Sequence, residues 1–223
     1  RLIAHFDVLV ENFSPGTLDR WGLPRSVIDE INPRLTVLRI SGFGQDGPYS
    51  NNAGFARVAE AMSGFTYICG EQERPPMHCG FPISDSVTGL FGAFSILVAC
   101  YDKRANPEAP GEEIDLSLFE SMFRLLEFSV IGYDQLGHVH ERSGNRSQYA
   151  GPSNVYPTRD GKWASISAST QNVFERLAEA IGQPELATDP RFATNVDRIR
   201  NADALDRIIG DWVAARDMSA VTE

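Results

Sequence analysis

The sequence "LTVLRISGFGQDG", residues 35–47, joins an apolar, β-branched run to a loop with three glycines. Turn residues bound the run on both sides, so a β-strand is predicted at 35–41. The glycines match the G-x-G-x-x-G spacing of dinucleotide-binding proteins, but that fingerprint requires a helix to begin on them. Here Pro48 and polar residues as far as Asn52 follow instead. We therefore predict an irregular turn at the end of a strand, and no dinucleotide site.

Strands and helices alternate on both sides of this stretch. Further strands are predicted at 6–10 and 112–118. Helices are predicted just after Ser14 and Pro15, at 25–31, near 57–65, from 86 to about 104, and from about 118 to 136. This alternation predicts an α/β domain, Rossmann-like, with a largely parallel sheet.

The pattern changes after Gly137, where a polar, turn-rich segment suggests a linker. Two strands are then predicted around the Asp160–Gly161 turn. Thr170 and Gly182 suit the two ends of the next helix, and another helix is predicted at about 202–215. We place a boundary at residue 142, with residues 1–141 in the large α/β domain and 142–223 forming a linker and a smaller α+β domain.

Charge and cysteine content exclude several classes of partner. The chain has 20 basic and 30 acidic residues, a net charge of −10, and no basic run, so no nucleic-acid partner is expected. The longest apolar run, 90–101, is shorter than a membrane-spanning helix requires, so no membrane partner is expected. Three cysteines, an odd number, match no zinc spacing and give no disulfide framework, which favours a reducing cytoplasm. His138 and His140 lack further ligands, so no metal site is predicted.

Asp85 lies where a loop meets the long apolar helix, in "GFPISDSVTGLFGAF", residues 80–94. One hypothesis makes it a helix cap, since a carboxylate there accepts backbone N–H bonds and benefits from the helix dipole. A second makes it a nucleophile, because Gly80 and Gly89 would admit a substrate and the helix amides would stabilise an oxyanion. The two roles do not exclude each other.

A second candidate site follows the first predicted strand. Asn12 and Phe13 lie just past its carboxyl end, where open α/β sheets bind ligands. Arg20, a little further on, could bind a phosphate through two hydrogen bonds. The same residues would also suit an ordinary strand–turn–helix connection with a surface arginine.

Taken together, several stretches resemble the family III CoA-transferases, which include formyl-CoA transferase and carnitine CoA-transferase. They occur in the family's order and cover nearly the whole chain. The matching stretches are "DVLVENFSPGTLDRWGL", "NPRLTVLRISGFGQDGPY", "AGFARVAEAMSGF", "RPP", "DSVTGLFGA", "GNRSQYAGPSNVYPTRDGKW" and "DPRFATNVDRIRNADAL".

The resemblance implies that Asp85 is the catalytic aspartate. It also implies that CoA is contacted by Asn12, Phe13, Arg20, Ala53, Gly54, Phe55 and Ala56. The family fold is an α/β large domain plus a small domain, and two subunits interlock as a homodimer. By the same comparison, this chain is expected to be a fragment that lacks both ends of the family's chain.

The mechanism implied is covalent catalysis through an aspartyl-CoA thioester, with an acyl-CoA donor and a carboxylic acid acceptor as substrates and no tightly bound cofactor. Two alternatives stay open: an α-methylacyl-CoA racemase or epimerase, and a catalytically silent CoA-binding relative. Racemases carry a proton-shuttling His in a G-H-D motif where this chain has Gly54–Phe55–Ala56. Ala56 and Glu60 also depart from the residues of many members, which have an acidic residue and Gln there. No residue identifies the substrate acids.

Overall fold

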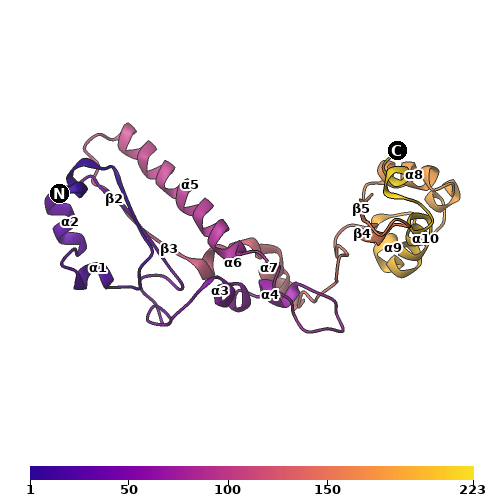
Figure 1. The fold of residues 1–223 in the computed structure, drawn as a ribbon, viewed down its shortest axis with the longest axis horizontal. Helices are drawn as coiled ribbons and strands as arrows, with labels where there is room; N and C mark the ends of the chain where they lie inside the picture. Colours follow the sequence, from indigo (N-terminus) through magenta and orange to yellow (C-terminus); the bar gives the residue numbers. More distant parts are fainter. The chain divides into compact units, whose positions relative to one another are not determined.

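The computed structural model describes residues 1–223, and the chain divides into two compact units (Figure 1). The first unit comprises residues 1–69 and 76–141, and the second comprises residues 70–75 and 142–223. A single boundary at residue 142 therefore leaves out the short segment 70–75, which groups with the second unit. The assignment of these parts to a CoA-binding domain and a small domain stays a prediction.

A three-stranded parallel sheet forms the centre of the first unit. Its strands are β1 (Val8–Glu11), β2 (Thr36–Ser41) and β3 (Glu113–Ser117), paired in that order. Val8 lies opposite Thr36, and Val37 lies opposite Glu113. The carboxyl ends of the three strands therefore meet at one edge. The predicted α/β class with a parallel sheet is confirmed.

The helices of the first unit agree only in part with the predicted bounds. They are α1 (Thr17–Arg20), α2 (Arg25–Ile31), α3 (Ala56–Met62), α4 (Phe65–Ile68), α5 (Ile83–Ala105), α6 (Leu118–Leu125) and α7 (Glu127–Leu136), with a 3-10 helix, η1, at Leu2–His5. The bounds of α2 were predicted correctly. Three predictions were wrong. α5 begins at Ile83, three residues before the predicted start. The predicted helices near 57–65 and at 118–136 are each interrupted, by the break between α3 and α4 and by the break between α6 and α7.

The two faces of the sheet are covered differently. Val37 on one face packs with Ile28 of α2 and Leu35, and all three are almost completely buried. Leu38, the next residue, points to the opposite face. There α5 lies along the strands (Figure 1), and a Cβ added to Gly92 would be 2.9 Å from Leu38 Cδ2. Gly92 therefore lets α5 approach the sheet closely.

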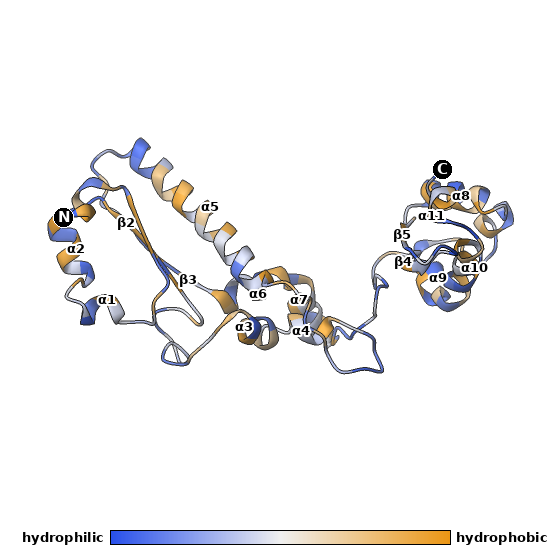
Figure 2. Ribbon diagram, in the orientation of Figure 1, coloured by the Kyte–Doolittle hydropathy of each residue, from blue (hydrophilic) through white to orange (hydrophobic).

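Much of α5 consists of apolar residues (Figure 2), and several of them, including Leu90, Phe94 and Leu97, are exposed. By length and composition, α5 is the one helix that could cross a membrane, and most of its apolar window is not buried in the structure. The run at 90–101 is too short by itself, but the helix that contains it begins at Ile83 and is long enough, so run length alone was a wrong basis for the prediction. One such helix is weak support for a membrane segment, since core helices of soluble proteins have the same features. The absence of a membrane partner stays a prediction.

The second unit has its own core. β4 (Ser153–Pro157) and β5 (Trp163–Ser167) form the predicted antiparallel hairpin. The helices are α8 (Gln171–Ala180), α9 (Asn195–Arg200), α10 (Ala202–Ala214) and α11 (Met218–Thr222), with a 3-10 helix, η2, at Pro184–Ala187. The hairpin and helices enclose a buried cluster that includes Tyr156, Phe174, Phe192, Leu205 and Ile209. The two shortest α-helices of this unit, α9 and α11, were not predicted.

Candidate active site

A cavity of about 570 Å³ opens at the carboxyl edge of the parallel sheet. Residues at the ends of β1 and β2 and in the first turns of three helices line it. They are Asn12, Ile40, Ser41, Gly42, Gly54, Phe55, Ala56, Arg57, Pro82, Asp85 and Leu118. In parallel α/β sheets ligands bind outside this edge. The cavity is therefore the candidate site for chemistry.

A second cavity of about 380 Å³ adjoins the first and shares part of its wall. The shared residues are Asn12, Ser41, Gly42, Gly54 and Phe55. Phe13, Arg20 and Ala53 line the second cavity alone, while Ala56 and Asp85 line the first alone. Every site residue predicted from the sequence thus lines one cavity or the other. Their individual roles stay predictions.

Asp85 is not the cap of its helix. It is the third residue of α5, behind the N-cap residue Pro82, and no side chain next to the helix start caps it locally. The Asp85 side chain is exposed and is the one carboxylate that lines the first cavity. The hypothesis that Asp85 is the cap is wrong in this structure, and its carboxylate is available to a ligand.

Glu60 of α3 supplies a carboxylate to the start of α5. Its side chain is only 2% exposed, and its Oε1 accepts a long hydrogen bond, 3.5 Å, from the Ser84 N–H. Its Oε2 lies 3.4 Å from His78 Nδ1. Ser84, itself fully buried, donates through Oγ to the Leu118 carbonyl. Glu60 therefore helps to fix the helix turn that presents Asp85, a contact from outside the helix that its own sequence does not reveal.

A row of charged residues supports the turn after β1. Glu11, almost buried at the end of the strand, accepts a hydrogen bond of 2.8 Å from the Phe13 N–H. Its other oxygen is 3.4 Å from Arg39 of β2, whose Nε is 2.8 Å from Glu113 of β3. A buried charge must be paired in this way, because an unpaired one is strongly destabilising. These charged residues hold Asn12 and Phe13 at the cavity wall. The sequence analysis did not identify them, because their pairing links three different strands.

Arg20 is held beside the same turn. Its guanidinium donates to Thr17 Oγ1 at 2.7 Å and to the Pro15 carbonyl at 3.4 Å. The ring of Phe13 packs edge-on against Trp21, with centroids 4.9 Å apart. The Arg20 guanidinium contacts no carboxylate, so its charge remains available to an anion at the second cavity.

The loop after β2 is shaped by close contacts. A Cβ on Gly42 would be 2.8 Å from Gly54 Cα, so two loop segments approach at distances that only glycine permits. Asp115 of β3 accepts a hydrogen bond of 2.8 Å from the Gln45 N–H. Burial raises the pKa of Asp115, and this backbone bond partly opposes the rise. No helix begins on the glycines of this loop, so the predicted irregular turn is confirmed.

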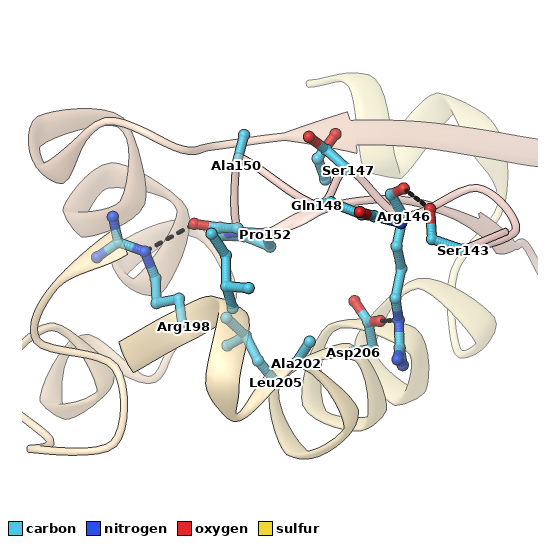
Figure 3. Close-up of a pocket in the computed structure, with 13 residues that line it drawn as sticks. Ser143, Arg146, Ser147, Gln148, Ala150, Pro152, Arg198, Ala202, Leu205 and Asp206 are labelled. Atoms are coloured by element: carbon cyan, nitrogen blue, oxygen red, sulfur yellow. Dashed lines mark hydrogen bonds and ion pairs between the residues drawn. The ribbon is translucent and has the colours of Figure 1, made fainter. Parts of the chain in front are cut away.

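The second unit contains a smaller cavity of about 210 Å³ (Figure 3). Arg146 on its wall is ion-paired with Asp203 at 2.7 Å and with Asp206 at 2.5 Å. Arg198 is buried, and its Nε donates to the Gly151 carbonyl at 2.7 Å. The charged groups of this cavity are thus occupied by partners within the protein. They secure the segment after residue 142 against α9 and α10.

A sequence model described as CoA-transferase family III matches residues 1–223. The succinyl-CoA–D-citramalate CoA-transferase of Chloroflexus aurantiacus is 44% identical over 95% of this chain and 52% of its own length. The acetyl-CoA:oxalate CoA-transferase of Acetobacter aceti is 36% identical over 92% of this chain and 52% of its own length. The chain spans about half the length of the curated relatives it matches.

Solved structures show the same fold. A CaiB/BaiF family protein from Brucella suis superposes with a TM-score of 0.83 and 32% identity, over 99% of this chain and 58% of that protein. A protein of Mycobacterium tuberculosis, Rv3272, superposes with a TM-score of 0.83 and 25% identity, over 100% of this chain and 57% of its own. The fold of both units therefore occurs in longer proteins.

Proposed function

The chain belongs to CoA-transferase family III, and from that premise we propose that the protein transfers CoA from an acyl-CoA to a carboxylic acid. The observation that supports this proposal most strongly is the arrangement of two adjoining cavities. The cavity at the carboxyl edge of the sheet contains one carboxylate, that of Asp85. It shares part of its wall with the second cavity, which Arg20 lines. This arrangement supports Asp85 as the nucleophile, with the adjoining cavity available to the long, anionic CoA moiety.

We propose that Asp85 reacts covalently. Its carboxylate attacks the donor thioester, forms an aspartyl–acyl anhydride and releases the CoA thiolate. The thiolate attacks the aspartyl carbonyl, so the donor acid leaves and an aspartyl-CoA thioester remains. The acceptor carboxylate attacks this thioester and again releases the thiolate, which then attacks the acceptor carbonyl of the new anhydride. The new acyl-CoA leaves and Asp85 is regenerated. Splitting the exchange into such steps lowers the barrier to each.

Short dicarboxylic acids are the substrate class that we propose. The relatives are named for succinyl-CoA with citramalate or malate, for acetyl-CoA with oxalate, and for succinate with glutarate. Each of these names contains a dicarboxylic acid.

We also propose that the protein works in the cytoplasm, with no tightly bound cofactor, as an interlocked homodimer. The exposed apolar side of α5 supports association, because a large unpaired apolar surface marks an interaction site. Two relatives are named as the alpha and beta subunits of one malate CoA-transferase, so pairing with a related chain is the alternative arrangement.

Racemase chemistry is less well supported by the same cavity. Proton abstraction and return on opposite sides of a carbon require two groups that exchange protons. The lining has Asp85 and Arg57 as its titratable side chains, and an arginine keeps its proton at neutral pH. Phe55, where racemases have His, cannot exchange a proton. The cavity therefore favours transfer.

Mixing the full-length protein with succinyl-CoA and isotopically labelled dicarboxylic acids in deuterated water tests this proposal. Mass spectrometry should detect labelled acyl-CoA without deuterium at the α-carbon. Deuterium uptake at that carbon without exchange of CoA would indicate racemase chemistry. Binding of CoA thioesters with neither reaction would indicate a silent relative.

A further inference from the structure

Arg57 is the one cation that lines the cavity containing Asp85. It lies in the first turn of α3, and its side chain is exposed. The structure gives its guanidinium no ion pair and no hydrogen bond, in contrast to Arg20, which binds Thr17 and Pro15. A charged donor group without a protein partner therefore belongs to the lining of the site.

Local structure does not explain an arginine at this position. A cation in the first turn of a helix is disfavoured by the positive end of the helix dipole. Glu60, one turn further along α3, does not offset this, because its oxygens face Ser84 and His78. A residue that opposes local stability without compensation is the kind expected at a functional position.

In the proposed reaction, a dicarboxylic acid has a second carboxylate that requires a cation to bind it. One carboxylate of a dicarboxylic acid is consumed as the reacting group at Asp85, while the other keeps its negative charge throughout. Leaving that second carboxylate unpaired near the Asp85 carboxylate would be unfavourable. A guanidinium binds a carboxylate with two parallel hydrogen bonds, which gives both strength and geometric selectivity.

We propose that Arg57 binds the non-reacting carboxylate of the acid and so selects dicarboxylic over monocarboxylic substrates. This inference rests on the proposed transferase function. It makes Arg57 a specificity-determining residue, whereas Asp85 carries out the chemistry. Arg20, on the wall of the adjoining cavity, is left for the CoA moiety.

The test compares succinate with butyrate, which has the same chain length and one carboxylate, as acceptors of CoA from one donor. For the wild type, kcat/KM should be higher with succinate. Arg57→Met removes the charge and keeps similar bulk, and it should reduce the succinate-to-butyrate ratio by about 10- to 100-fold, mainly through KM. Arg57→Lys should restore part of the ratio, because it keeps the charge without the two-pronged geometry.

Arg104→Met is the matched control. Arg104 is an exposed arginine near the other end of α5, where it lines a separate cavity with Arg34 and Lys103. This variant should keep the wild-type ratio. If Arg57→Met transfers CoA with an unchanged succinate-to-butyrate ratio, the role proposed for Arg57 is overturned, while the transferase proposal stands.

A binding measurement separates this inference from the proposed function. Isothermal titration of the CoA-saturated wild type should detect tighter binding of succinate than of butyrate, and Arg57→Met should lose the difference. Equal binding of both acids by the wild type would overturn the role of Arg57 even if CoA is transferred. Absence of transfer together with Arg57-dependent succinate binding would instead overturn the transferase proposal and leave the dicarboxylate site.

Discussion

Glu60 is a buried carboxylate of α3 that contacts the first turn of α5. Its carboxylate lies between the Ser84 N–H and the His78 ring, beneath the turn that contains Asp85. Glu60→Ala should lower the free energy of unfolding by about 3 kcal/mol, because it leaves a buried N–H and a histidine without their acceptor. Urea denaturation followed by circular dichroism would measure the change.

Glu60→Gln is the control for that prediction. An amide oxygen can still accept the Ser84 N–H, so this variant should lose only about 1 kcal/mol. Equal stabilities of Glu60→Ala, Glu60→Gln and the wild type would mean that the carboxylate does not secure the start of α5.

Tyr156 makes the second unit sensitive to alkaline pH. Burial, followed by its hydrogen bond of 2.6 Å to Asp206 and the charge of that residue, raises the pKa of the Tyr156 hydroxyl above its usual value. A raised pKa means that the folded state holds the proton more tightly. The resulting stability is fully present below the unfolded pKa of about 10 and is lost as pH rises beyond it.

Tyr156→Phe removes the titrating group and should therefore lack this alkaline loss of stability. At neutral pH the variant should be about 1 kcal/mol less stable, since one hydrogen bond is missing. Chemical denaturation between about pH 8 and 11 would compare the two proteins. The same alkaline loss in both would assign it to other groups.

Among the elements, α5 contains two glycines with different surroundings. Gly92 faces Leu38, whereas a Cβ on Gly89 would meet nothing within 4 Å. Gly89→Ala should therefore raise the free energy of unfolding by about 1 kcal/mol, because alanine favours the helix and restricts the unfolded chain. Thermal denaturation would measure this increase.

Gly42→Ala provides the contrast, because the new Cβ would be 2.8 Å from Gly54 Cα and would force the two loops apart. This variant should be less stable than the wild type and should bind CoA thioesters more weakly. A stability loss in Gly89→Ala, or none in Gly42→Ala, would contradict the packing described for these glycines.

The elements that were predicted correctly are bounded by turn residues that are adjacent in the sequence. Asn32–Pro33 ends α2, and the Asp160–Gly161 turn fixes the hairpin of the second unit. The start of α5 could not be predicted in the same way, because Pro82 is the N-cap residue and the nearby carboxylate comes from α3. The break at Leu126 between α6 and α7 likewise depends on tertiary packing, since that residue is buried.

The candidate site was only partly visible in the sequence. The resemblance located Asp85 and the residues on the walls of both cavities. It noted Glu60 only as a departure from the family, and it did not identify Glu11, Arg39 or Arg57. Glu11 and Arg39 interact across strands, and Glu60 contacts a helix that begins more than twenty residues later. Such contacts join residues that are far apart in the sequence, so they produce no short sequence motif that could be recognised. The substrate acids were not predicted either.

At the level of the whole molecule, the exposed apolar side of α5 bears on how the protein associates. Its apolar side chains Leu90, Phe94, Leu97, Val98 and Tyr101 are 54–76% exposed. We expect the full-length protein to be a homodimer at micromolar concentration, and Leu97→Asp to weaken the dimer if this face lies in the interface. Light scattering would measure the mass of both proteins.

A stable monomer of the wild type would contradict the proposed assembly. A dimer that Leu97→Asp leaves intact, while the variant unfolds more easily, would show that α5 is covered by the protein's own chain. An exposed substitution elsewhere, such as Glu175→Gln on α8, should change neither property.

The role of Asp85 is tested most directly by chemical trapping. Full-length protein should be mixed with a donor acyl-CoA and then with hydroxylamine, which converts an aspartyl thioester or anhydride to a stable hydroxamate. Asp85→Asn should fold and bind CoA as the wild type does, while transfer slows by several orders of magnitude, on the order of 5 kcal/mol or more of barrier. Mass spectrometry of the peptides locates the modified residue. We predict a hydroxamate on Asp85 and none in the Asn variant, whereas a label on another carboxylate, or full activity of Asp85→Asn, would contradict the assignment.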